Sequence, residues 1–144
     1  MKKLLLTAAA FLLACPAFAD VRRPDGFWKL TDSKGNPKSV IRVFPQGKNT
    51  YGAMIVQYYT DTKAVCSACT DENKNKPING LVFMQGLKTT DGVTFSGGKI
   101  LDPDTGKISK AKMVVKADGR HLVINSYGLL GSWFGSSDVW VRAQ

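Results

Sequence analysis

Two cysteines three positions apart, Cys66 and Cys69, are the groups in this sequence whose spacing most clearly offers chemistry. A Cys-x-x-Cys pair exchanges disulfides when it follows a strand and opens a helix, because that setting lowers the pKa of the attacking thiol. No thioredoxin-like pattern surrounds Cys66, so we expect a structural disulfide and keep thiol exchange as the alternative. Closing so short a ring contributes only about 2 kcal/mol, which shapes a loop rather than holding a domain together.

His121 is the single histidine, and this limits the other chemistries. A zinc site needs three or four donors, and a Ser-His-Asp hydrolase would have to recruit His121 although no Gly-x-Ser-x-Gly elbow occurs. Glu72 is the one glutamate and lies in a lysine-rich loop, while most aspartates stand in turns that need them for backbone reasons. We therefore expect no catalytic residue, no metal and no cofactor, and we interpret His121 as an exposed side chain.

The first residues have the pattern of a secretory signal peptide. Two lysines precede an apolar run over residues 4–14, and Ala17 and Ala19 suit the signal peptidase, so we expect cleavage after Ala19. The run is too short to span a bilayer comfortably. The sequence thus predicts a signal peptide over 1–19, a single domain over 20–144, and a periplasmic or secreted location without a transmembrane segment in the mature chain.

Cys15 leaves a second processing route open, because the residues before it loosely resemble a lipobox and would make the mature protein a lipoprotein. The net charge is +9, and removal of the signal peptide leaves 18 basic side chains against 11 acidic ones, a net charge of +7. The lysines are spread singly rather than clustered among aromatic readers, so nucleic acid is not an expected partner. We interpret the charge as a solvated surface with some attraction to anionic envelope lipids or polysaccharide.

The mature sequence indicates short strands separated by turns rich in Gly, Pro, Asn and Asp. The clearest strand covers residues 108–116, where lysines alternate with Ala111, Met113 and Val115. A tight hairpin signal, Asp118-Gly119, follows it, and consecutive hairpins predict an up-and-down antiparallel meander. The eight expected strands span residues 26–30, 39–44, 50–59, 81–87, 93–101, 107–116, 120–127 and 138–142.

An all-β chain of eight antiparallel strands removes its exposed edges most simply by closing into a barrel, although a sandwich also fits the pattern. A barrel of this size is either filled by side chains or holds one small ligand. On the third strand, Met54, Val56 and Tyr58 are assigned to the inner face and Ala53 and Ile55 to the outer one. The inward residues expected to bind a small apolar or amphipathic ligand are Ile41, Val43, Met54, Val56, Tyr58, Phe95, Met113, Val115, Leu122 and Ile124.

Several motifs along the mature chain carry a resemblance to a known family. They are Gly26-Phe27-Trp28, Tyr51-Gly52, Pro77 to Leu81, Gly86-Leu87, Gly97 to Ile100, Asp102 to Lys107 and Trp140-Val141-Arg142. Over nearly the whole mature length the chain resembles the bacterial exported family called domain of unknown function 2147, which belongs with the lipocalin-like calycin barrels. This chain departs from the family pattern at Phe95-Ser96 and at Ser109, so no binding feature is carried over there.

The resemblance implies how the barrel closes but supplies no activity. In lipocalin-like barrels a first-strand tryptophan closes one end and a last-strand arginine packs across it. Trp28 and Arg142 occupy those places here, and a guanidinium over an indole face contributes about 1 to 2 kcal/mol when it is partly desolvated.

A glycine-rich segment, Gly128–Gly135, concentrates apolar and aromatic residues outside the strands. Such a loop folds onto the core, caps a barrel mouth or docks a partner. The sequence therefore predicts an exported, non-catalytic ligand-binding protein. The alternative is an envelope protein-interaction module, an assembly factor or inhibitor, that uses the 128–135 and 60–79 loops and in which Trp133 and Phe134 carry the contact.

Overall fold

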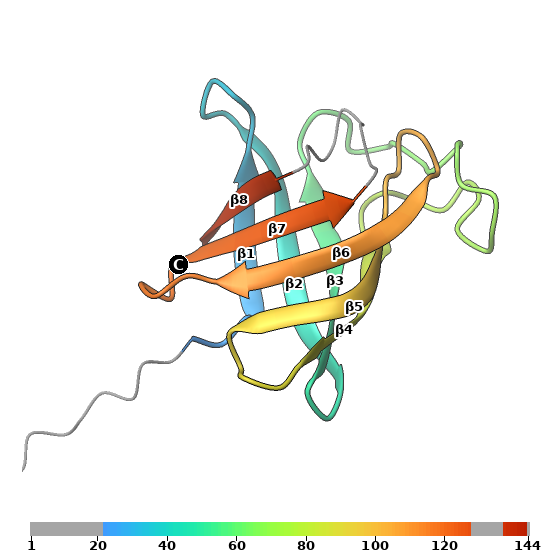
Figure 1. Ribbon diagram of the computed structural model, residues 1–144. Helices are drawn as coiled ribbons and strands as arrows, with labels where there is room; N and C mark the ends of the chain where they lie inside the picture. The colour runs from blue at the N-terminus through green and yellow to red at the C-terminus, as the bar shows by residue number, and fades with distance from the viewer. Residues whose placement is uncertain (1–21, 128–136, 144) are drawn as a thin grey trace, which may run out of the picture.

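The computed structural model describes residues 22–127 and 137–143, which form a closed antiparallel barrel (Figure 1). The strands are β1 (Gly26–Thr31), β2 (Pro37–Gly47), β3 (Thr50–Tyr58), β4 (Val82–Thr89), β5 (Thr94–Leu101), β6 (Ile108–Val115), β7 (His121–Tyr127) and β8 (Ser137–Arg142). Each strand pairs with the next and β8 pairs with β1, so the predicted eight-stranded up-and-down barrel is confirmed and the sandwich is excluded. The expected signal peptide, Cys15 and the 128–135 segment lie outside the described residues. No helix of the described part has the length and apolar character to cross a membrane.

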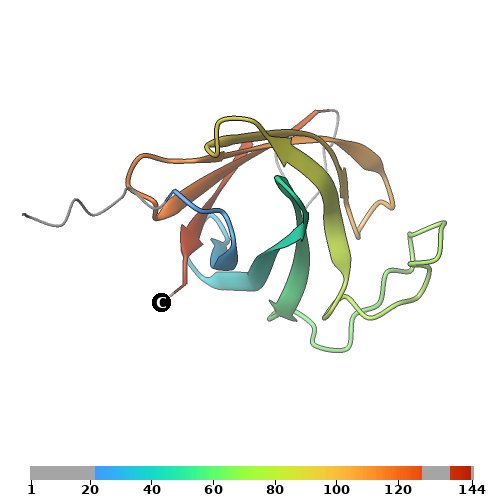
Figure 2. The same cartoon turned by 90° about the horizontal axis from the view of Figure 1, so that it is seen from below.

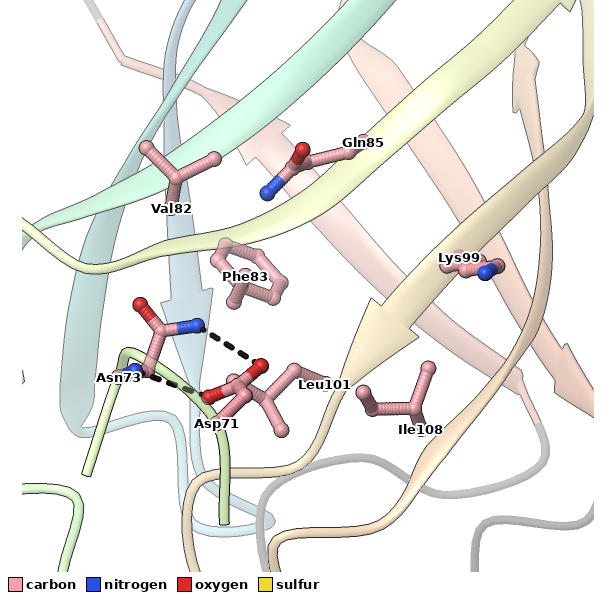
Figure 3. Close-up of a pocket in the computed structure, with 8 residues that line it drawn as sticks. All are labelled: Asp71, Asn73, Val82, Phe83, Gln85, Lys99, Leu101 and Ile108. Carbon is pink, nitrogen blue, oxygen red and sulfur yellow. Dashed lines mark hydrogen bonds between the residues drawn. The ribbon is translucent and has the colours of Figure 1, made fainter. Parts of the chain in front are cut away.

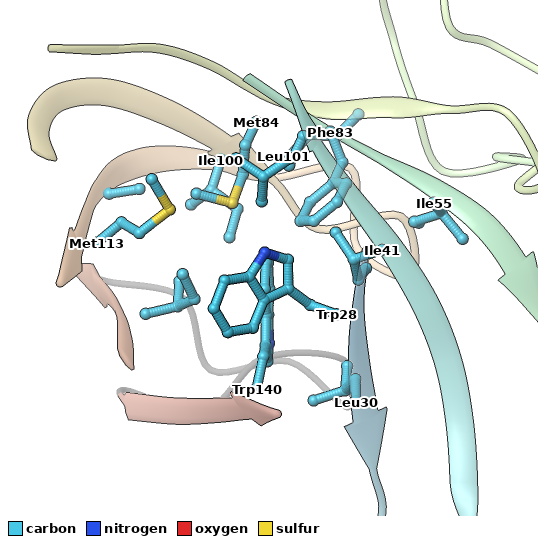
Figure 4. Close-up of a cluster of buried hydrophobic side chains, with 14 of the residues drawn as sticks. Trp28, Leu30, Ile41, Ile55, Phe83, Met84, Ile100, Leu101, Met113 and Trp140 are labelled. Atoms are coloured by element: carbon cyan, nitrogen blue, oxygen red, sulfur yellow. The ribbon is translucent and has the colours of Figure 1, made fainter. Parts of the chain in front are cut away.

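The strands alternate between a buried and a solvent face, as the sequence pattern requires. In β7, Leu122, Ile124 and Ser126 are buried while the residues between them are partly exposed. Large side chains converge in the interior, and the ring centroids of Phe83 and Trp140 lie 6.0 Å apart (Figure 4). The barrel thus contains a core of bulky apolar groups, which is one of the two interiors available to eight strands.

On β3, the prediction that Met54 and Val56 face inward is wrong. Ala53 and Ile55 are buried instead, at 1% and 0% exposure, whereas Val56 is 38% exposed. The register explains the difference: Val40 pairs with Gln57 and the next residue pairs with Ile55, which leaves Val56 as the extra residue of a β-bulge. A bulge moves later residues to the other face, so a strict alternation counted back from Tyr58 assigned the wrong face.

One end of the barrel, which we call the plugged end, is where β1 begins and β8 finishes. Trp28 is fully buried there, and the Arg142 guanidinium lies 4.3 Å from the centroid of its ring. Trp28 Nε1 donates to the carbonyl of Pro24, at 2.8 Å. Arg142 donates to the backbone carbonyls of Gly119 and Asp25, at 2.9 and 3.1 Å, and to that of Arg23. The polar atoms of this plug are therefore bonded within the chain.

The opposite end, which we call the loop end, is where β3 finishes and β4 begins. A long connection over residues 59–81 projects from it, beside β4, and is drawn in light green (Figure 2). Two pockets lie between this connection and the barrel strands.

Candidate functional site

The sequence-predicted binding residues fall into two groups in the structure. Seven are buried in the barrel, between 0% and 2% exposed: Ile41, Val43, Phe95, Met113, Val115, Leu122 and Ile124. Met54 is half-buried and Val56 exposed on the outer face, while Tyr58 is half-buried and packs against the core. Other fully buried large side chains were not among the predicted binding residues, and they include Phe83, Met84, Ile100 and Trp140, together with Trp28, which was predicted only to close the barrel (Figure 4).

The 59–81 connection is a compact loop built around the disulfide between Cys66 and Cys69. Both cysteines are fully buried. Across the loop, Cys66 N donates to Lys76 O at 2.8 Å, and Ile78 N donates to Ala64 O at 2.9 Å. Burial shields the bond from attack by an external thiol, so the structural interpretation of the pair is favoured over thiol exchange.

The loop is also fixed to the barrel. Ile55 N donates to Leu81 O at 2.9 Å, and Tyr58 N donates to the Asn79 side chain at 2.8 Å. On its other side the loop packs on the β5–β6 turn, where a Cβ on Gly106 would come within 2.0 Å of Ala68 O. The wall that this loop makes beside β4 is therefore held from both sides.

A pocket of about 190 Å³ lies between this loop and the ends of β4, β5 and β6. Val82, Phe83 and Leu101 lie on the loop side of the Met84–Ile100 pair, while Gln85 and Lys99, which also line the pocket, form the next pair of the β4–β5 ladder. Its apolar lining is Val82, Phe83, Leu101 and Ile108, and its polar lining is Asp71, Asn73, Gln85 and Lys99 (Figure 3). We call it the apolar pocket.

A second pocket of about 290 Å³ adjoins the first and shares Asn73, Val82 and Gln85 with it. Its other lining residues are Glu72, Lys76, Pro77, Asn79, Gly80 and Leu81. We call this the polar pocket, and the two together the β4 groove. One half of the groove thus offers hydrocarbon surface and the other mostly polar side chains and loop backbone.

The charges in the groove are separated. Asp71 lies on the loop side, where its carboxylate accepts the backbone N–H and the side-chain amide of Asn73, at 2.9 and 3.3 Å (Figure 3). Lys99 lies on the β5 side, opposite Gln85 in the strand register. A bound molecule would therefore meet the Lys99 cation on the barrel side. On the loop side it would meet the Asp71 carboxylate, which is already bonded to its own loop, and, in the polar pocket, Glu72 and Lys76.

Sequence reasoning missed the groove although a signal for it exists. Residues 81–84 are four consecutive apolar residues, Leu-Val-Phe-Met, which breaks the period-two pattern. Such a run indicates a strand covered on both faces. The structure covers this strand end with the barrel interior on one side and the 59–81 loop on the other, and both Phe83 and Met84 are buried.

His121 lies at the plugged end, far along the strands from the groove. Its Nδ1 is hydrogen-bonded to Asp118, whose other oxygen accepts the backbone N–H groups of Arg120 and His121. These bonds, that of Arg120 first and that of the His121 side chain second, lower the pKa of Asp118. Asp118 thus acts as a turn residue. Within residues 22–127 and 137–143, no three His, Cys, Asp or Glu side chains are grouped to hold a metal ion.

Lys38, the second residue of β2, is a partly buried cation at the loop end. Burial has the largest effect on the pKa of the Lys38 amine and lowers it. The carboxylates of Asp104, Asp138 and Asp102 act in the opposite direction. The β5–β6 turn and the start of β8 therefore bring acidic groups toward β2 at this end.

Comparison with known proteins agrees with this architecture. A solved structure, protein HP1028 from the human pathogen Helicobacter pylori, is described as belonging to the lipocalin family and aligns with a TM-score of 0.68. The alignment covers 83% of this chain and 82% of that one at 17% identity, a level that speaks for the fold alone. A search of curated proteins gave no match.

A model of one protein family matches most of the sequence. It is described as "Uncharacterized protein conserved in bacteria (DUF2147)" and it matches residues 26–142, from the first residue of β1 to the last of β8. The resemblance inferred from the motifs is thereby confirmed. The chain belongs to the DUF2147 family, and its fold is lipocalin-like.

Proposed function

We propose that this protein is an exported, non-catalytic binding protein for a small apolar or amphipathic ligand, and that the ligand occupies the β4 groove. A lipocalin-like barrel is typically a binding scaffold. Export is supported by the signal-peptide pattern of the first residues and by the Cys66–Cys69 disulfide, which is typical of an oxidising compartment outside the cytoplasm. The groove is the observation that carries the binding proposal.

The groove has the composition of a small-molecule site. Such sites combine an apolar lining with a few polar groups that orient the ligand, and their volumes start at roughly 300 Å³. The apolar pocket supplies the first element through Phe83, Leu101 and Ile108, and the adjoining polar pocket of about 290 Å³ extends the space. An amphipathic molecule fits this division better than a purely polar or purely apolar one.

The groove also relates to the interior site that the sequence predicts. Phe83 lines the apolar pocket and faces Trp140 inside the barrel, at 6.0 Å between ring centroids. A ligand in the groove would thus lie against the wall of that interior. The interior is packed with large side chains, so a ligand would reach it only if Phe83 and its neighbours moved. On that condition the interior residues stay part of the proposal as a deeper extension of the site.

A fluorescence titration tests the proposal with N-phenyl-1-naphthylamine, an uncharged apolar probe. We expect Ile108→Ser to weaken probe binding about tenfold, because a polar group replaces apolar contact in the pocket. Val139→Ser is the matched control, since Val139 is similarly exposed at 47% against 56% but lies on β8 outside the groove. Equal binding by wild type and both variants would overturn the groove as the binding site.

The alternative of an envelope interaction module depends on the 128–135 segment, which lies outside the described residues. Its other half, the 60–79 loop, is a wall of the groove with a buried disulfide. The alternative therefore stays a prediction of the sequence.

A further inference from the structure

Four outward-facing side chains form one row across four neighbouring strands. The strand register pairs Gln85 of β4 with Lys99 of β5, Lys99 with Lys110 of β6, and Lys110 with Tyr127 of β7. Residues paired in this way on one face of an antiparallel sheet have Cβ atoms about 4.5–5.5 Å apart. We call this set the basic row, because two lysines stand side by side at its centre.

The pairing of Lys99 with Lys110 is unfavourable for the barrel itself. Like charges directly opposite each other on adjacent strands destabilise a sheet. No ion pair of Lys99 or Lys110 with another residue is found in the part of the chain that the structure describes. Lys112, two positions along β6 on the same face, adds a third positive charge beside them. This corner of the sheet therefore holds positive charge that its own neighbours leave uncompensated.

The basic row begins inside the groove. Gln85, Lys99 and Ile108 line the apolar pocket (Figure 3). Ile108 lies two positions before Lys110 on the outer face of β6. Apolar surface and paired ammonium groups are thus adjacent on the same strands. The acidic lining residue Asp71 lies on the loop side, where Asn73 donates to both of its oxygens.

We infer that the ligand of the β4 groove carries a negatively charged head, held between Lys99 and Lys110, on an apolar body that enters the apolar pocket. This inference rests on the proposed function and specifies its ligand class as an anionic amphiphile. A carboxylate, sulfate or phosphate head would accept hydrogen bonds from both ammonium groups and would relieve their repulsion. Gln85 and the Tyr127 hydroxyl, at the two ends of the row, are placed to add neutral hydrogen bonds.

A set of amphiphiles with the same ten-carbon chain and different heads separates the contribution of the head from that of the apolar body. Decanoate, decanol and decyltrimethylammonium compete for N-phenyl-1-naphthylamine bound to the full mature chain. We expect decanoate to compete about tenfold more strongly than decanol, the gain typical of charge-assisted hydrogen bonds at a partly exposed site, and the cationic amphiphile to compete least. If decanol and decanoate compete equally while the probe binds in the groove, the charged head is overturned and the proposed function stands.

Two lysine variants assign the effect to the basic row. Lys99→Gln and Lys110→Gln should each remove most of the decanoate advantage and leave decanol competition unchanged. Lys29→Gln is the control for net charge, because Lys29 is exposed on β1 away from the groove. Thermal unfolding gives an independent reading: Lys110→Gln should be no less stable than wild type, since it removes a repulsive pair. A variant that binds decanoate like wild type would overturn the inference.

Two further arms distinguish the source of the anion. Inorganic phosphate alone should fail to displace the probe, because it lacks the apolar body. Vesicles of phosphatidylglycerol should not retain the protein through the groove, so Ile108→Ser should leave vesicle binding unchanged. If phosphate alone displaces the probe, the inference is overturned and the ligand is a free anion.

If Lys99→Gln abolishes vesicle binding while dissolved decanoate does not compete for the probe, the inference is overturned and the site binds a membrane surface. If the neutral probe itself fails to bind, it is the proposed function that fails.

Discussion

The two ends of the barrel solve the problem of closure in opposite ways. At the plugged end, Arg142 covers Trp28 and donates to the carbonyls of three residues, and Trp28 Nε1 has its own acceptor. At the loop end, the side chains of Ser39 and Asp102 are buried with an oxygen that finds no hydrogen-bond partner among the described residues. The plug itself is thus internally bonded, whereas the loop end retains two unbonded oxygens and the open pockets. The buried Nε1 of Trp140, two residues before Arg142, also has no hydrogen-bond partner among the described residues.

This difference indicates where stability and function reside. Buried polar groups that are fully bonded make a structure rigid, whereas an unbonded buried oxygen is unfavourable and is found where a partner or water completes the site. The β4 groove lies at the loop end, together with the disulfide loop and the partly buried Lys38. We therefore expect substitutions at the plugged end to change unfolding, and substitutions at the loop end to change both unfolding and binding.

The largest effect is expected from Arg142→Ala at the plugged end. The change removes the guanidinium from the Trp28 ring and from three backbone carbonyls, so we expect the free energy of unfolding to fall by about 3 kcal/mol. Urea denaturation measures this. Arg120→Ala is the control, because Arg120 is an exposed arginine of the neighbouring turn, and it should change stability by less than about 0.5 kcal/mol. Equal losses in both variants would contradict the role of the plug.

Gly106→Ala should have the next largest effect, at the loop end. Gly106 has a φ of +70° and its Cβ would meet Ala68 O at 2.0 Å, so strain and a backbone clash add to a loss of about 2 to 3 kcal/mol. Gly35→Ala is the matched control, since Gly35 has a φ of +83° with nothing within 4 Å, and it should lose only about 1 kcal/mol. The difference between the two unfolding free energies measures the contact of the loop with the β5–β6 turn. A difference of zero would show that this contact does not contribute to stability.

The double substitution of Cys66 and Cys69 by alanine should reduce stability by about 2 kcal/mol, as expected for a ring of four residues. It should also weaken binding of the neutral probe, because the loop that the disulfide shapes is one wall of the groove. Arg142→Ala, in contrast, should leave probe binding unchanged at temperatures where the variant is folded. Titration of each variant with the probe at 10 °C checks both predictions. Normal binding by the cysteine variant would show that the disulfide loop is not part of the binding site.

The sequence predicts the barrel well because strand alternation and turn residues are local properties. The strand over 107–116 is observed as Ile108–Val115, with the alternating lysines on the outside. The bulge at Val56 could not be predicted in the same way, because it depends on pairing with Val40 and Ile41, which lie more than ten residues earlier. Local pattern therefore fixes the strands but not the face that each residue presents after an irregularity.

The groove was less accessible to sequence reasoning for a similar reason. Its lining comes from the 59–81 loop and from three strands, and nothing local shows that Asp71 and Ile108 face the same space. The basic row is a register property as well, since Lys99 and Lys110 become neighbours only when β5 pairs with β6. The apolar run over 81–84 was the one local sign of a strand covered on both sides.

The smallest expected effect is on stability at acidic pH. It tests whether the turn carboxylates at the two ends of the barrel contribute differently to stability. Hydrogen bonds lower the pKa of Asp118 at the plugged end, from Arg120 N first, and that of Asp32 at the loop end, from the Asn36 side chain first. A carboxylate with a lowered folded-state pKa contributes stability above its unfolded pKa, about 3.9, and loses it as the pH falls through the folded value. Asp118→Asn and Asp32→Asn should each flatten the decline in the urea midpoint between about pH 5 and pH 3.

Both carboxyls are exposed, so each effect is small, and the two should add in the double variant because the turns lie at opposite ends of the barrel. If the two variants change the pH dependence of the urea midpoint by similar and additive amounts, the two ends respond to acid alike. They would then differ only in the plug, the loop and the groove. If only Asp32→Asn flattens the decline of the urea midpoint, the acid sensitivity lies at the loop end, beside Lys38 and its surrounding carboxylates. The two ends would then also differ in their charges.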